Sequence, residues 1–129
     1  MANKIVLVDT SILIDLFRKT DKANSILISL VRQGFAYTIS AVTEYEIYIG
    51  ATLEQTDFWN SFLERTEVLA FDKTVAKVAV NLNRELKRKR KLIDTADLFI
   101  AATAVANKLP FATLNRRHFD RIDELTIIE

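Results

Sequence analysis

Three acidic residues of this sequence, Asp9, Glu46 and Asp97, have neighbours that are unusual for a charged side chain. Asp9 directly follows the β-branched and aliphatic run Lys4–Val8, and Asp97 directly precedes the apolar run 98–102. Glu46 has apolar residues one helical turn before and after it, so its side chain emerges beside an apolar stripe. A carboxylate in such surroundings is costly unless it meets a cation or hydrogen-bond donors. These residues are therefore the first candidates for a functional site.

Carboxylates that converge need a compensating charge. Two of them about 5 Å apart repel by roughly 3 kcal/mol at an effective dielectric constant near 20, so a cluster requires a cation or shared protons. The sequence has no Cys and one His, which leaves an all-oxygen set of ligands. Such a set favours Mg²⁺ or Mn²⁺ over zinc. A metal ion held in this way can activate water and neutralise charge on a phosphodiester.

Structural roles explain part of the same pattern. Asp9 is also a good helix cap, and capping explains the neighbouring Thr10 and Ser11 as well as a functional role does. Glu46 on a helix rim would pair with a basic side chain. Asp94 at a helix N-cap, with Asp97 three residues later, would complement the helix dipole. This last interpretation explains Asp94 better than Asp97, whose surroundings are more apolar.

The composition excludes several other kinds of chemistry. The absence of Cys rules out disulfides, thiol nucleophiles and iron–sulfur clusters. Two isolated glycines, Gly34 and Gly50, cannot build a P-loop or a GxGxxG turn. The chain of 129 residues has the usual size of one domain, so we expect a single domain over residues 1–129. Since the sequence shows neither a signal peptide nor a membrane span, we expect a cytoplasmic protein with no membrane partner.

Strand-like and helix-like segments alternate along the chain. Short apolar runs predict strands at 4–8, 35–39, 68–71, 110–113 and 126–128. Helical spacing and capping residues predict helices at 10–17, 22–32, 40–50, 56–65, from 72 to the basic run, 95–107 and 116–122. This alternation favours an α/β fold with a mostly parallel sheet covered on both sides. Ligands of such sheets bind beyond the carboxyl ends of the strands, where Asp9 is expected.

Four short blocks, taken in order, resemble the signatures of the PIN domain family. They are V-D-T-S at 8–11, I-S followed by Glu46 and Gly50, D-x-x-I-A-A-x-A at 97–104, and T-x-N-x-x-x-F at 113–119. Each block alone is weak, but their order and spacing span nearly the whole chain. They look most like the small single-domain ribonuclease toxins of VapC type.

The resemblance implies a three-layer α/β/α sandwich with Mg²⁺- or Mn²⁺-dependent endonuclease activity on RNA. It also implies a homodimer that is inhibited by a small antitoxin partner. The metal-binding acids of the family correspond to Asp9, Glu46 and Asp97. Its fourth catalytic position, often Asp, corresponds to Asn115, a neutral residue that leaves the number of metal ions open.

Side chains next to these positions have supporting roles under this hypothesis. Thr10 or Ser11 would orient Asp9 or a metal-bound water, and Thr113 would do the same for Asn115. Asp94 lies on the same helical face as Asp97 and would supplement the second metal site, whose occupancy the neutral Asn115 leaves open.

Basic residues flank the expected site. The segment from Arg84 to Arg121 contains ten basic and four acidic residues, a local charge of +6, whereas the rest of the chain carries −5. Two groups within it are candidates for RNA contact, namely Lys87, Arg88, Lys89, Arg90 and Lys91, followed by Arg116 and Arg117. The alternative for the first group is a solvated helix end. His118, the one histidine, is more simply a surface residue than a general base.

Two other acid-based folds fit less well. A phosphatase of the DxDxT type needs a second Asp where this sequence has Ser11, and receiver domains usually pair two acids where Asp9 stands alone. A PIN-like module that binds nucleic acid or a partner without cutting is the alternative that stays open, because Asn115 is neutral.

Overall fold

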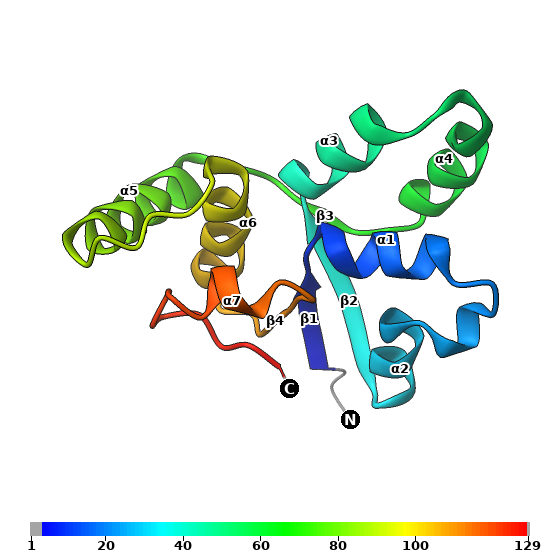
Figure 1. The fold of residues 1–129 in the computed structure, drawn as a ribbon, viewed down its shortest axis with the longest axis horizontal. Coiled ribbons are helices and arrows are strands. Elements are labelled where there is room, and N and C mark those ends of the chain that lie inside the picture. The colour runs from blue at the N-terminus through cyan, green and yellow to red at the C-terminus, as the bar shows by residue number, and fades with distance from the viewer. Residues whose placement is uncertain (1–3, 129) are drawn as a thin grey trace.

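The computed structural model describes residues 4–128 as a parallel sheet flanked by helices (Figure 1). Four strands lie in the order β3-β2-β1-β4, and every neighbouring pair is parallel. In the central register, Leu7 lies between Thr38 and Phe111. The strands are β1 (Lys4–Val8), β2 (Phe35–Ser40), β3 (Val68–Leu69) and β4 (Phe111–Ala112).

Helices connect the strands and cover both faces of the sheet. They are α1 (Thr10–Arg18), α2 (Ile26–Arg32), α3 (Ala41–Gly50), α4 (Thr56–Glu64), α5 (Lys73–Arg88), α6 (Thr95–Ala106) and α7 (Arg116–Phe119), with short 3₁₀ turns at η1 (Lys22–Asn24) and η2 (Leu53–Gln55). Over residues 4–128, none of these helices has the length and apolar character needed to cross a membrane.

Several expected elements differ from the sequence prediction, and the strand expected over 110–113 and the helix expected over 116–122 are shortened to β4 and α7. The helix expected over 22–32 is split, because Ser25 has an extended backbone and its hydroxyl accepts the Ile28 N–H to start α2 afresh. The strand expected over 126–128 is reduced, within the described residues, to one parallel bridge between Phe111 and Ile127. The predicted strand at 68–71 is also shorter, ending at Leu69.

The sheet separates two apolar cores, because successive side chains of a strand point to opposite faces. Leu7 and Phe111 face α5, α6 and α7, where they pack with residues such as Leu98. Val6 and Val8 face the opposite way and pack with residues of α1, α2 and α4, including Trp59. Figure 1 shows these two groups of helices on opposite sides of the sheet. The predicted three-layer α/β/α sandwich is confirmed.

Candidate functional site

Asp9 is the most buried acidic residue of the candidate site. It ends β1 and caps α1, and only 2% of its surface is exposed. Its Oδ1 accepts hydrogen bonds from the Ser11 N–H at 3.1 Å and from the Ser11 hydroxyl, while Oδ2 accepts the Thr113 hydroxyl at 2.7 Å. Burial raises the pKa of Asp9, and these hydrogen bonds oppose that effect. Capping and placement at the strand end are thus both correct for Asp9.

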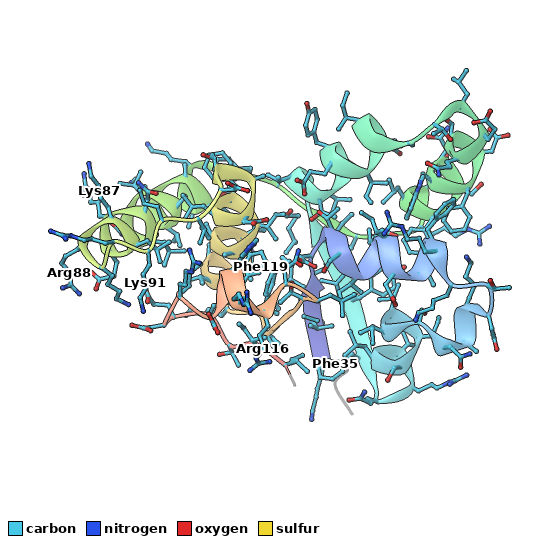
Figure 2. The ribbon with its side chains drawn as sticks, viewed as in Figure 1. Phe35, Lys87, Arg88, Lys91, Arg116 and Phe119 are labelled. Carbon is cyan, nitrogen blue, oxygen red and sulfur yellow. The ribbon has the colours of Figure 1, made fainter. Side chains whose placement is uncertain are left out.

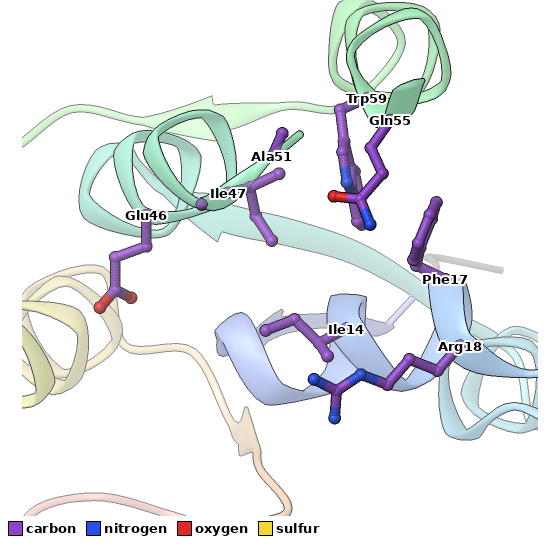
Figure 3. A pocket seen from close by; sticks show the side chains of 9 residues that line it. Ile14, Phe17, Arg18, Glu46, Ile47, Ala51, Gln55 and Trp59 are labelled. Atoms are coloured by element: carbon purple, nitrogen blue, oxygen red, sulfur yellow. The ribbon is translucent and has the colours of Figure 1, made fainter. Parts of the chain in front are cut away.

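Glu46 is held by a hydroxyl from the neighbouring helix. The Thr10 hydroxyl donates to Glu46 Oε1 at 2.5 Å and lies 3.1 Å from Thr43 Oγ1. Figure 3 shows the Glu46 carboxylate pointing from α3 toward α6. Of the two hydroxyl residues that were expected beside Asp9, Ser11 contacts it, whereas Thr10 positions Glu46.

Asp97 lies in the first turn of α6, with its side chain 22% exposed. Its Oδ2 is 3.5 Å from His118 Nδ1. Burial is the largest cause that raises the pKa of Asp97, the charge of His118 lowers it, and the carboxylates of Asp94 and Glu46 raise it. Asp94 occupies the N-cap position of α6, but its side chain makes no capping hydrogen bond. Asp94 and Asp97 therefore occupy the helix-start positions expected for them, and a role of Asp94 in complementing the helix dipole stays a prediction.

The three acids share one end of the sheet without closing on one another. Glu46 and Asp97 interact electrostatically, and Thr10, adjacent to Asp9, bonds Glu46. Among residues 4–128, no three acidic or histidine side chains are close enough to hold one ion together. The same part of the chain has no salt bridge from Lys or Arg to any of these acids. These carboxylates, unpaired with Lys or Arg, offer the oxygen ligands that a hard divalent cation prefers, and convergence of all three around it stays a prediction.

Asn115 directly precedes α7 and is exposed. Its backbone N–H donates to Thr113 Oγ1 at 2.9 Å, and the Thr113 hydroxyl donates to Asp9, so Thr113 joins the two residues. The role expected for Thr113 in orienting Asn115 stays a prediction. The Asn115 side chain lines an open hollow of about 530 Å³ together with Ser11 and Arg18.

His118 is the residue whose place at the site the sequence did not reveal. It follows Asn115 by three residues, and the packing of α7 against α6 places it beside Asp97. His118, Asp94 and Arg121 line another hollow, of about 360 Å³. The only sequence signal was its position within the last of the four blocks.

The basic run occupies the outer end of α5. Figure 2 shows Lys87, Arg88 and Lys91 there, far from the sheet. Arg88 pairs with Glu85, and Lys89 Nζ lies 2.6 Å from Asp123 Oδ2. Arg90 follows the helix in this exposed turn, whereas Arg116 and Arg117 belong to α7, the helix that carries His118. RNA contact through either group stays a prediction.

A smaller hollow of about 260 Å³ separates α1 from α3 and α4 (Figure 3). Its lining is largely apolar, including Phe17, Ile47 and Trp59, with Glu46 and Arg18 at its edge. Trp59 is 3% exposed and lies 5.4 Å from Phe17, ring centre to ring centre. Trp59 therefore belongs to the core.

A parallel sheet with buried Asp9 at the end of its central strand, and further acids on the helices around it, is the architecture of the PIN domain. Residues 6–125 match the model of that family, and the chain belongs to it. Its relatives include Ribonuclease VapC1 of Methanocaldococcus jannaschii, 36% identical over 92% of this chain and 82% of the relative. Ribonuclease VapC10 of Mycobacterium tuberculosis is 32% identical over 94% of this chain and 90% of its own.

Solved structures agree with this assignment. A chain of the DNA-bound VapBC complex of Salmonella typhimurium matches with a TM-score of 0.84 and 26% identity, covering 98% of each chain. A chain of VapBC-1 from nontypeable Haemophilus influenzae gives a TM-score of 0.81 at 25% identity, covering 97% of each. The predicted resemblance to VapC-type PIN domains is confirmed.

Proposed function

We propose that this protein is a Mg²⁺- or Mn²⁺-dependent endoribonuclease and the toxin of a toxin–antitoxin pair. The observation that carries the proposal is the Asp9 carboxylate, buried at the end of β1 and bonded, within residues 4–128, to neutral donors only. The ribonuclease names of the VapC relatives support RNA as its substrate.

Asp9, Glu46 and Asp97 are the residues that would hold the divalent ion. When bound, the ion supplies a water of lowered pKa and neutralises charge on the phosphodiester. Ser11 and Thr113 hold both oxygens of Asp9 in one orientation, and Thr10 does the same for Glu46. Fixed ligand orientation of this kind commonly contributes about 10- to 100-fold to metal affinity or activity.

A protein partner is the second part of the proposal. The VapBC structures are toxin–antitoxin complexes, which supports a small antitoxin as the inhibitor of this chain. Exposed apolar side chains on and beyond α3 also favour protein contact, since Ile49 is 70% and Leu53 92% exposed. We further propose that the protein forms a homodimer, which size-exclusion chromatography with light scattering would measure.

The test is RNA cleavage by the purified chain, free of any partner. We expect endonucleolytic cuts with Mg²⁺ or Mn²⁺, none in EDTA, and inhibition by the product of a short neighbouring reading frame. A protein that folds and binds RNA but leaves it intact with either metal would favour the alternative, a binding module. The neutral Asn115 is the observation that favours that alternative.

A further inference from the structure

The open hollow between α1 and the loop before α7 adjoins the candidate catalytic carboxylate. Ser11 forms part of its wall and donates its hydroxyl to Asp9. The opposite side of the Ser11 hydroxyl accepts the Leu114 N–H at 3.0 Å, which fixes the loop against α1. A group bound in the hollow would therefore contact Ser11, whose hydroxyl is bonded to Asp9.

The hollow offers a cation without an acidic partner. Arg18 is exposed and forms no salt bridge within residues 4–128. Figure 3 shows its side chain running back along α1, with the guanidinium below Ile14. Lys19 adds a second positive charge, and Asp15, whose Oδ1 lies 3.7 Å from Lys19 Nζ, adds a negative one, so the charged residues of the lining sum to +1. An anion is the ligand that such a wall favours.

The facing wall offers an amide. Asn115 occupies the N-cap position of α7, but its side chain makes no capping hydrogen bond. Its backbone N–H is already bonded to Thr113, and within residues 4–128 its side-chain amide has no hydrogen-bond partner that would compete with a ligand in the hollow. A carboxamide both donates and accepts hydrogen bonds, so it can read the edge of a base.

We propose that this hollow is the subsite for the nucleotide next to the scissile phosphate. Arg18 binds the phosphate of that nucleotide through its planar fork, and Asn115 bonds its base edge. The volume of about 530 Å³ falls within the usual range for small-ligand sites. This subsite rests on the proposed ribonuclease function. It places RNA on the α1 side of Asp9 and not on the basic run, part of which is neutralised by Glu85 and Asp123.

The phosphate contact is tested by binding in the absence of metal. A fluorescein-labelled single-stranded oligoribonucleotide is titrated with protein in EDTA, and anisotropy is followed at several salt concentrations. Arg18→Gln is expected to weaken binding about tenfold and to lower the slope of log affinity against log salt by about 0.7, the loss of one phosphate contact. The matched control, Arg84→Gln, changes an exposed arginine of α5 in the opposite layer and should behave as wild type.

The base contact is tested by mapping cuts in an oligoribonucleotide pool of random sequence. Asn115→Ala is expected to flatten the preference at one position beside the cut. If Arg18→Gln binds as tightly as Arg84→Gln with the same salt slope, the subsite is wrong. If Lys87→Gln instead weakens binding and lowers the salt slope, RNA binds along α5. Wild-type protein that leaves RNA intact with Mg²⁺ and Mn²⁺ would refute the ribonuclease itself, whereas active wild type with an unaffected Arg18→Gln refutes only the subsite.

Discussion

The Asp9 carboxylate is almost completely buried, and its hydrogen-bond donors in the described part of the chain are all neutral. Ser11 and Thr113 supply those bonds, which favour the charged form, while burial favours the neutral form and is the larger effect on its pKa. Burial removes water from the Asp9 carboxylate but brings no cation to it, which leaves the negative charge of the carboxylate available to a metal ion. The same arrangement should cost stability when no metal is bound.

Asp9→Asn tests this cost in metal-free protein. The pKa of Asp9 is higher in the folded than in the unfolded protein, so wild type loses stability as pH rises from the unfolded-state pKa to the folded-state pKa. At pH values above the folded-state pKa this loss is complete and constant. The Asp9→Asn variant has no carboxyl group to titrate and lacks this loss. The melting temperature of the variant minus that of wild type should therefore become more positive from acid to neutral pH. RNA cleavage should fall about 100-fold or more.

Thermal melts in EDTA across pH measure the first effect, and a cleavage assay with Mg²⁺ measures the second. The exposed Asp120→Asn serves as control and should alter neither. Asp9→Asn that is less stable than wild type at neutral pH would show that the carboxylate stabilises the fold.

Thr113→Val tests the positioning of Asp9. Valine has nearly the same shape, but it loses the donor to Asp9 Oδ2 and the acceptor for the Asn115 N–H. We expect cleavage to fall about 10- to 100-fold, with a loss of about 1 kcal/mol in unfolding free energy.

The control is Thr103→Val, which removes a buried hydroxyl that donates to the Phe99 carbonyl. Equal activity of the two variants would remove Thr113 from the site.

The acids could be found from sequence because each stands beside an apolar segment. Their partners could not. Thr10 meets Glu46 across 36 residues of sequence, and His118 meets Asp97 only because α7 packs against α6. Side-chain contacts between helices depend on their packing, which the spacing of residues along one helix does not determine.

Helix starts were predictable because capping is local. Asp9, Ser40 and Asp72 each accept a hydrogen bond from an N–H two or three residues later, and a helix follows each of them. The short strands were not predictable in length. β3 and β4 contain two residues each, because a strand extends only as far as a neighbour pairs with it.

Lys108 ends α6 in a conformation that suits glycine. Its φ is +56°, and the Leu109 N–H bonds back to the Ala104 carbonyl at 3.0 Å, a common way to terminate a helix. Lys108→Gly should raise the unfolding free energy by about 0.5 kcal/mol, since relief of strain exceeds the added freedom of the unfolded chain. Urea denaturation measures it. Lys108→Ala keeps the Cβ and should match wild type, so equal stability of the Gly and Ala variants would contradict the argument.

At the scale of the molecule, β1 belongs to both cores. Leu7 points into one core, and Val6 and Val8 into the other. The alternation of strands and helices predicted a covered parallel sheet, but the strand order and the distance of the basic run from the acids depend on contacts between remote segments. Because one strand serves both layers, we expect them to unfold together.

Phe111→Ala tests this coupling. Phe111 is fully buried in the core of α5, α6 and α7, with its ring centre 4.7 Å from that of Phe119, so its truncation should cost about 3–5 kcal/mol. Trp59, the one tryptophan, lies in the opposite core and reports it by fluorescence. Fluorescence and far-UV circular dichroism should therefore shift to the same lower urea midpoint. The exposed Val80→Ala should shift neither.

A Trp59 transition that keeps the wild-type midpoint while circular dichroism shifts would mean that the two layers unfold separately. The candidate acids lie on both sides of that division, since Glu46 and Asp97 come from α3 and α6 and Asp9 from the end of β1. Independent layers would let the spacing of these acids change without global unfolding. Coincident transitions would instead mean that the sheet fixes the position of Asp9 relative to both helices, so that closure around an ion requires only side-chain movement.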